Sequence, residues 1–430
     1  MISATNFRYA FPSCVVADSI RQSVYLLVAY LVVIANLAGC SSAIEPTTET
    51  QLMHSQHNVS SWQTLEESRA KTQYVVMVNP TILADVFKYV EAENRAIWNP
   101  LLMKFHVDVI EALQTRGSSA TPLVILSKST INTLNRQTMQ NEQTTKAKQY
   151  EQLIAERGLD LGSVQFIETD KPIASYWTRD ITPLTQTNQD GSRRLLQSNK
   201  TDREDATSMS ELLSAHTELD IYDITNGLSF EGGNIAIVPV EQSDQCFFTS
   251  FVKQSNGYLS QTNTAFETNF ASQGRQHLGC DINVVESSLL SATPHIDMYM
   301  RSLEATMLVG QYEEPDLFGN QAKLEHVADQ LISQGITVER MLMPPVLFQE
   351  NLNKTTFPIY TNATIINSVI LVPQYASTIA PIYAHYDQRA LNRYRQLLPG
   401  FSIVPIDMPK HFIKAGGSIH CLTSTILKGP

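Results

Sequence analysis

Apolar residues over most of the chain alternate between short runs typical of buried strands and longer stretches with helical spacing. The short runs predict strands over 74–78, 122–126, 163–168, 235–238, 307–310, 337–341, 365–373 (two strands) and 401–405. The longer stretches predict helices over 86–97, 107–113, 146–157, 322–331 and 386–398. Strands that alternate with helices indicate an α/β body. No change of composition divides it, so we predict one domain over 71–430.

Two segments lack this periodicity. Residues 41–70 are mostly polar and predict a flexible tether ahead of the domain. Residues 186–220 are also polar, and we expect them to form a long surface excursion that could act as a lid.

The amino terminus has the pattern of an export signal over residues 1–40. Arg8 and Arg21 precede the apolar run 24–37, and Leu37-Ala38-Gly39-Cys40 follows. This tetrapeptide resembles a bacterial lipobox, which would make Cys40 the lipidated first residue of the mature chain. Ser41 after it favours a periplasm-facing outer membrane. The alternative is an uncleaved helix in the inner membrane, because an uncharged stretch of about 20 residues can span a bilayer.

Composition narrows the function classes. The 430 residues include 31 Lys and Arg against 42 Asp and Glu, a net charge of −11, with no basic block. This balance argues against a nucleic-acid surface, since duplex affinity comes mainly from basic contacts to phosphate. Five Cys in so long a chain do not form a disulfide scaffold. A Cys246–Cys280 bridge is permitted in an oxidising compartment, but two buried thiols are an equally good reading.

Four short segments combine polar residue types that core packing does not require. In chain order they are Tyr176-Trp177-Thr178-Arg179-Asp180, Glu231-Gly232-Gly233-Asn234, His295-Ile296-Asp297 and Gly416-Gly417-Ser418-Ile419-His420-Cys421-Leu422-Thr423. We expect the first segment to be a strand with Arg179 and Asp180 on opposite faces, and the third to be extended with His295 and Asp297 on one face. Paired glycines let the backbone approach a ligand closely.

A cysteine with a distant histidine and several carboxylates suggests nucleophilic catalysis, although the local signatures of papain-like and caspase-like proteases are absent. Carboxylates beside a thiol disfavour the reactive thiolate unless a cation lies between them. A guanidinium substrate supplies that cation: two carboxylates accept its N–H groups, and its charge stabilises the thiolate that attacks its carbon. A histidine can then protonate the departing ammonia and activate water.

These four motifs, in this order from Trp177 to Thr423, resemble those of the agmatine deiminase and bacterial peptidylarginine deiminase family of guanidino-group-modifying enzymes. The resemblance implies a five-bladed α/β propeller of ββαβ modules, the pentein fold, around a central active site. It also implies hydrolysis of a guanidino group to a ureido product and ammonia without a cofactor. Departures from the family pattern at Pro294 and Ser418 leave the substrate open among agmatine, arginine and peptidyl-arginine.

The resemblance also implies a role for each motif residue. Cys421 would be the nucleophile and His295 the general acid and base. The remaining roles would be orientation of His295 by Glu231, binding of the guanidinium by Asp180 and Asp297, and lining of the pocket by Trp177, Arg179, Gly416 and Gly417.

Three alternatives remain at this stage. A metal site could use His295, Asp297, His420 and Cys421, but no second ligand pair at zinc spacing occurs. An amidinotransferase would use the same cysteine intermediate with an amine acceptor. A non-catalytic guanidine-binding lipoprotein would need none of the acid–base groups.

The expected partners are a guanidino substrate and a membrane reached through the lipid anchor only, with the oligomeric state open.

Overall fold

The strands of the computed structural model pair into five sheets that repeat one pattern, in which an antiparallel pair is followed by a helical crossover and a parallel strand. The structure describes residues 60–80, 92–127, 136–171, 173, 175–198, 204–240, 243–257, 263–285, 294–313, 319–346 and 357–429. Within these ranges, the segment from Asn58 to Pro430 clusters as one unit. The predicted export signal, Cys40 and most of the predicted tether lie outside the described residues.

Three sheets show the pattern in its simplest form. Their strands are β8 (Ala236–Pro239), β9 (Asp244–Thr249) and β10 (Asp281–Val285); β11 (Met300–Leu303), β12 (Thr306–Gln311) and β13 (Thr337–Leu342); and β14 (Thr364–Ile366), β15 (Val369–Gln374) and β16 (Ser402–Asp407). In each sheet the first two strands are antiparallel and the last two are parallel. The crossover helices are α6 (Phe251–Ser255) with α7 (Asn263–Gln273), α8 (Asn320–Ser333) and α9 (Ala384–Leu397).

The fourth sheet has the order β1-β5-β6-β7 and contains most of residues 186–220. Its elements are β1 (Trp62–Thr64), β5 (Leu184–Asn188), β6 (Arg193–Gln197), α5 (Glu204–Thr217) and β7 (Asp220–Asp223). The prediction of a surface excursion here is therefore wrong. An Asp190-Gly191 turn, with Gly191 at φ +83°, joins β5 to β6 as a hairpin.

The fifth sheet joins the two ends of the domain. It has the order β17-β2-β3-β4, with β17 (Ser424–Leu427) antiparallel to β2 (Thr72–Pro80) and followed by β3 (Thr121–Ser127) and β4 (Gln165–Thr169). Its crossover helices are α2 (Ala92–Thr115) and α3 (Arg136–Glu156). Because β17 begins three residues after Cys421, its pairing with β2 fixes where the thiol lies.

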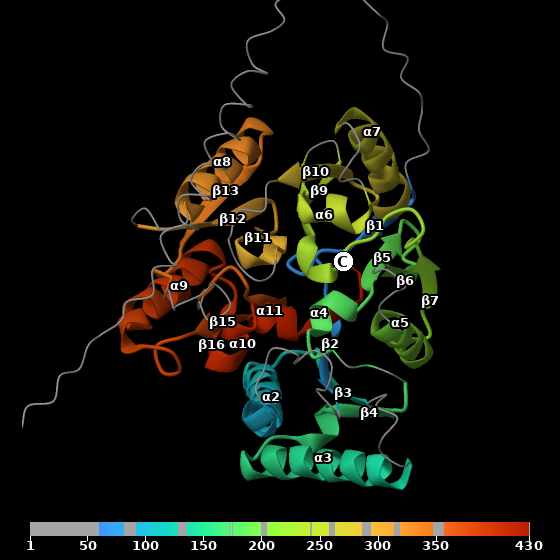
Figure 1. The fold of residues 1–430 in the computed structure, drawn as a ribbon, viewed down its shortest axis with the longest axis vertical. Coiled ribbons are helices and arrows are strands. Elements are labelled where there is room, and N and C mark those ends of the chain that lie inside the picture. The colour runs from blue at the N-terminus through green and yellow to red at the C-terminus, as the bar shows by residue number, and fades with distance from the viewer. Residues whose placement is uncertain are drawn as a thin grey trace, which may run out of the picture. The chain divides into compact units, whose positions relative to one another are not determined.

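Every sheet thus contains a ββαβ unit, and the fold is the five-bladed α/β propeller expected from the motifs. Figure 1 shows the long crossover helices at the periphery, whereas the short helices α4 (Thr178–Ile181) and α11 (Ile419–Leu422) lie near the middle of the domain. Another short helix, α10 (Lys410–Lys414), precedes α11. The central strands are buried on both faces, as Val75 to Val78 on β2 show.

The predicted tether is wrong for residues 60–70, because this stretch belongs to the folded domain. Trp62–Thr64 pairs with β5, and Glu67 is 7% exposed. Polar side chains here are satisfied by partners far away in the sequence, so the segment has no apolar periodicity to reveal it. Among the described residues, no helix combines the length and apolarity needed to cross a membrane.

Candidate active site

The five polar residues predicted to carry the chemistry lie together although 241 positions separate the first from the last. We call them the thiol cluster: Asp180, Glu231, His295, Asp297 and Cys421. Each lies in or next to a single helical turn, namely α4, the 3-10 turns Gly232–Asn234 and Ile296–Met298, and α11. The predicted strand around Asp180 and the extended form of 295–297 are therefore wrong. Each turn nevertheless directs its polar side chain towards the others.

The thiol of Cys421 is buried and touches one carboxylate and one amide. Its Sγ lies 3.6 Å from Asp297 Oδ2 and accepts a hydrogen bond from Asn362 Nδ2 at 3.3 Å. Burial, with the negative charges of Asp297 and Asp180, raises the pKa of the Cys421 thiol well above its usual range. The thiol is therefore neutral at pH 7 unless a cation offsets these charges.

His295 lies between two carboxylates. Its Nε2 is 2.6 Å from Glu231 Oε2, and its Nδ1 is 3.4 Å from Asp180 Oδ1. Burial alone would lower the pKa of His295, but the charge of Asp180 and the hydrogen bond to Glu231 outweigh it and raise the pKa to about 9. The ring is a cation at neutral pH and has a proton to donate.

Gly233 lies where three of these groups converge. A Cβ built at this position would lie 2.8 Å from His295 Nδ1, 3.0 Å from Asp180 Oδ1 and 3.1 Å from Asp297 Oδ2. Only glycine lets the three side chains approach the backbone this closely. Two of them are carboxylates and one is a proton donor, and Asp297 also reaches the thiol.

Asp297 connects this cluster to the residues behind it. Its Oδ2 accepts a 2.7 Å hydrogen bond from His420 Nδ1, whereas its Oδ1 is buried without a hydrogen-bond partner among the described residues. Against the effect of burial, the hydrogen bond from His420 holds the pKa of Asp297 below its usual range. Asp297 is therefore ionised and keeps one oxygen available for a donor.

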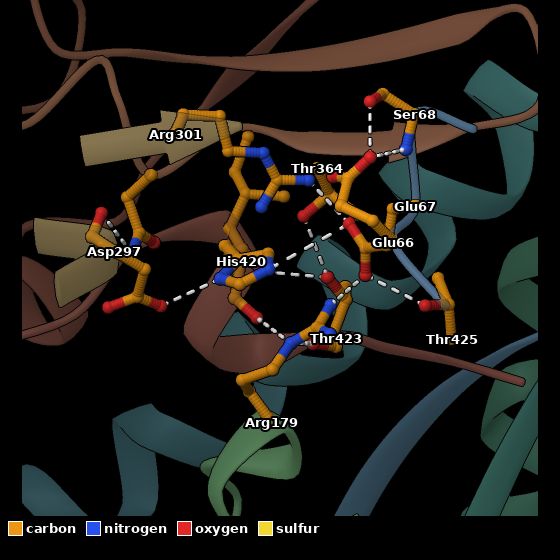
Figure 2. Close-up of polar contacts among 12 residues, drawn as sticks. Glu66, Glu67, Ser68, Arg179, Asp297, Arg301, Thr364, His420, Thr423 and Thr425 are labelled. Atoms are coloured by element: carbon orange, nitrogen blue, oxygen red, sulfur yellow. Dashed lines mark hydrogen bonds and ion pairs between the residues drawn. The ribbon is translucent and has the colours of Figure 1, made fainter. Parts of the chain in front are cut away.

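A second group of buried polar residues lies behind Asp297, and we call it the rear network: Glu67, Arg179, Arg301, His420 and Thr425. Figure 2 shows Arg301 and Arg179 reaching the Glu67 carboxylate from opposite sides, with His420 between Glu67 and Asp297. Thr425 Oγ1 donates to Glu67 Oε1 at 2.7 Å. A small cavity of about 60 Å³ is lined by Glu67, Arg179, Arg301, His420 and Asp297, among others.

The predicted lining residues are divided between these two groups. Trp177 packs over Gly417, where a Cβ would collide with the indole ring and lie 3.0 Å from Cys421 Cβ. Gly416 has φ +88°, a conformation that favours glycine. Arg179, in contrast, belongs to the rear network, where its Nε also donates to the carbonyl of Thr423 at 3.2 Å.

Three donors of the thiol cluster are close enough to hold a metal ion. Ligand atoms of Asp180, Glu231 and His295 lie within 4.8 Å of one another. The pairing of a protonated His295 with its two carboxylates accounts for this spacing, so the geometry does not itself require a metal. The alternative set suggested by the sequence does not form such a group among the described residues, since the donors close enough to share an ion are those of Asp180, Glu231 and His295.

Comparison with known proteins identifies the family of the chain. The family model for Porphyromonas-type peptidyl-arginine deiminase matches residues 102–426. The chain belongs to this family. Its members are enzymes that hydrolyse C–N bonds, so the general activity is deimination of a guanidino group. A search of curated protein sequences finds no match.

Solved structures agree on the fold of this deiminase. A substrate-bound variant of C. jejuni agmatine deiminase is 18% identical, with a TM-score of 0.62 over 86% of this chain and 97% of that one. Agmatine deiminase of Enterococcus faecalis is 16% identical, with a TM-score of 0.60 over 85% and 95% of the two chains. At such low identity these similarities concern the fold alone.

The sequence did not reveal three residues at the deiminase site. Asn362 contacts the thiol, and its carbonyl accepts from the His420 backbone N–H at 3.2 Å. His420 was considered only as a metal ligand, and Glu67 lay in the predicted tether. The position of His420 next to Cys421 could have indicated a role at the site, whereas no feature of the sequence pointed to Glu67.

Proposed function

We propose that this chain hydrolyses the guanidino group of agmatine, arginine or peptidyl-arginine to a ureido group and ammonia through a covalent thiouronium at Cys421. The observation that carries this proposal is the convergence of two carboxylates and a protonated histidine at Gly233, beside a neutral thiol, because these are the groups needed to bind and attack a planar cation.

Substrate binding supplies the charge that the thiol lacks. Asp180 and Asp297, whose carboxylates both reach the point beside Gly233, accept N–H groups of the guanidinium. The substrate cation offsets the two negative charges that raise the pKa of Cys421. The thiol then gives its proton to solvent water, and the thiolate attacks the guanidinium carbon to give a neutral tetrahedral adduct.

His295 moves the protons in both halves of the reaction. Its charged ring protonates one nitrogen of the adduct, ammonia leaves, and an S-alkylthiouronium cation remains with a neutral His295. The neutral ring then takes a proton from water as the water oxygen attacks the same carbon. Collapse of this second adduct breaks the C–S bond, the hydroxyl proton passes to the departing sulfur to restore the thiol, and the ureido product is released. Glu231 keeps the ring oriented through its 2.6 Å contact with Nε2.

A panel of guanidines tests this function and identifies the substrate. The full-length chain is incubated with agmatine, free arginine or an arginyl peptide, without an amine acceptor, and ammonia and ureido product are measured. We expect equal amounts of both from at least one substrate, loss of turnover in Cys421→Ala, and normal turnover in Arg389→Ala, an exposed control on α9. Undiminished release of ammonia by Cys421→Ala would disprove the covalent step.

We also propose that the enzyme is exported as a lipoprotein anchored through Cys40 and acts on guanidines outside the cytoplasm. Support comes from the bond between Cys246 on β9 and Cys280 before β10, because disulfides persist mainly in oxidising compartments. Cys40→Ser should shift the enzyme from the membrane to the soluble fraction. Unchanged membrane partitioning would instead favour an uncleaved anchor helix.

A further inference from the structure

His420 is buried beside the nucleophile on α11, and its side chain binds Asp297 of the thiol cluster. Its side chain is 6% exposed, and its Nδ1 lies 2.7 Å from Asp297 Oδ2. The Cys421 Sγ approaches the same oxygen at 3.6 Å. Neighbouring residues of one helical turn therefore meet at a single oxygen of Asp297.

This arrangement assigns different tasks to the two oxygens of Asp297. Oδ2 accepts from His420, faces the thiol and is the Asp297 oxygen nearest the point beside Gly233, whereas Oδ1 has no hydrogen-bond partner among the described residues. A buried carboxylate oxygen left unpaired is costly, so a donor is expected when the site is filled. Rotation of the carboxylate would exchange the two oxygens and misplace both contacts.

At pH 7 the His420 ring can donate a hydrogen bond through only one of its two nitrogens. Burial, with the charges of Arg179 and Arg301, lowers the pKa of His420 to about 4, so the ring is neutral at pH 7. Since an ionised Asp297 can only accept, the single ring proton is on Nδ1. The unprotonated Nε2 then lies 3.8 Å from Glu67 Oε2, beside the two guanidinium groups that pair with Glu67.

Glu67 fixes the far side of this ring (Figure 2). It pairs with Arg179 of α4 and Arg301 of β11, and it accepts from Thr425 of β17. One carboxylate thus joins three separate elements around His420. Against the effect of burial, the two arginines hold the pKa of Glu67 below its usual range, so it is ionised.

We propose that His420 is a positioning residue, whose Nδ1–H holds the Asp297 carboxylate in the orientation that receives the substrate guanidinium, and that Glu67 with its two arginines holds the His420 ring in place. This inference rests on the proposed deiminase function. It predicts that the hydrogen bond donated at Nδ1 matters for substrate binding, rather than the bulk or charge of the ring.

Two amide substitutions separate the hydrogen bond from packing. In His420→Asn the amide can occupy the position of Nδ1 and still donate to Asp297, whereas in His420→Gln it reaches the position of Nε2. We expect kcat/KM to fall by less than about 10-fold in His420→Asn but by about 100-fold in His420→Gln, mainly through a higher KM. Circular dichroism and thermal unfolding of both variants control for folding.

The outcomes distinguish this inference from the function on which it rests. Equal kcat/KM in His420→Asn and His420→Gln, with normal turnover by the unchanged enzyme, would overturn the role of His420 alone. Absence of guanidine turnover in the unchanged enzyme would overturn both proposals.

A measurement on the unchanged protein covers the case in which His420→Gln does not fold. Nitrogen-15 NMR of histidine-labelled enzyme, with the signal assigned by its loss in His420→Asn, should show a neutral ring protonated at Nδ1 at pH 7. A ring protonated at Nε2, or at both nitrogens, would contradict the proposal.

Discussion

Asp297 joins two buried polar groups that differ in how completely their central carboxylates are paired. In the rear network, Glu67 Oε1 binds Arg179 and Thr425, and Oε2 binds Arg301, although Arg301 Nε has no hydrogen-bond partner among the described residues. In the thiol cluster, Asp297 Oδ1 has no hydrogen-bond partner in the same part of the chain, and His295 Nδ1 has only its 3.4 Å contact with Asp180. Buried polar groups that are paired stabilise a fold, and those left unpaired mark where a ligand is expected.

This difference explains why two equally buried groups should respond differently to substitution. Losing a member of the rear network leaves neighbouring charges unpaired in an apolar environment. Its main effect should therefore be on the free energy of unfolding rather than on activity. Altering the thiol cluster removes an interaction that is completed only by substrate and should reduce activity first. The following substitutions test that division.

The largest expected effect is on stability, from Glu67→Ala. The change leaves two buried guanidinium groups without their carboxylate, and breaking a buried pair in this way typically costs about 3–5 kcal/mol. Urea unfolding measures the loss. The control is Glu313→Ala, which removes an exposed partner of Arg389 and should cost less than about 1 kcal/mol. Equal losses in both variants would contradict a structural role for the rear network.

The next largest effect is on activity, from Gly233→Ala. The added Cβ occupies the point where His295, Asp180 and Asp297 converge, so kcat/KM should fall by about 100-fold or more. Unfolding free energy should change by no more than about 1–3 kcal/mol, as for other overpacked sites.

Gly400→Ala is the matched control for this prediction, because a Cβ there meets no atom within 4 Å. Its activity and stability should match those of the unchanged enzyme. Normal turnover in Gly233→Ala would show that the guanidinium binds elsewhere.

Much of the fold could be predicted from the sequence because its central strands are covered on both faces. The apolar runs at 74–78, 122–126 and 365–373 correspond to β2, β3 and the pair β14 and β15. The β1-β5-β6-β7 sheet was missed because it buries polar side chains that pair with distant residues. Gln186 shows this: it is fully buried and donates to Thr64 and to the carbonyl of His277.

The candidate site divides in the same way. The members of the thiol cluster could be predicted because they lie in short motifs of polar residues that core packing does not require. Glu67 was not predicted because its role depends on partners such as Thr425, 358 positions away. No local sequence pattern encodes such a contact. The opposed directions of Arg179 and Asp180 were expected from a strand, but a helical turn produces them.

The smallest expected effect concerns the charge on His295 and depends on pH. Its folded-state pKa of about 9 lies above the unfolded value of about 6.5, so the ion pair stabilises the fold fully below about pH 6.5. That contribution is lost as the pH rises through 9. Glu231→Gln removes one partner and lowers this pKa. We therefore expect it to cost about 1–2 kcal/mol of unfolding free energy near pH 6, and less near pH 9.5.

Urea unfolding of both proteins at the two pH values measures this difference. The control is Glu211→Gln on α5, which removes an exposed partner of Lys171. It should change the free energy of unfolding by less than about 0.5 kcal/mol at either pH. A cost of Glu231→Gln that does not change between the two pH values would mean that His295 is not charged in the free enzyme. The thiol cluster would then lack its proton donor, and the contrast with the rear network would concern packing rather than charge.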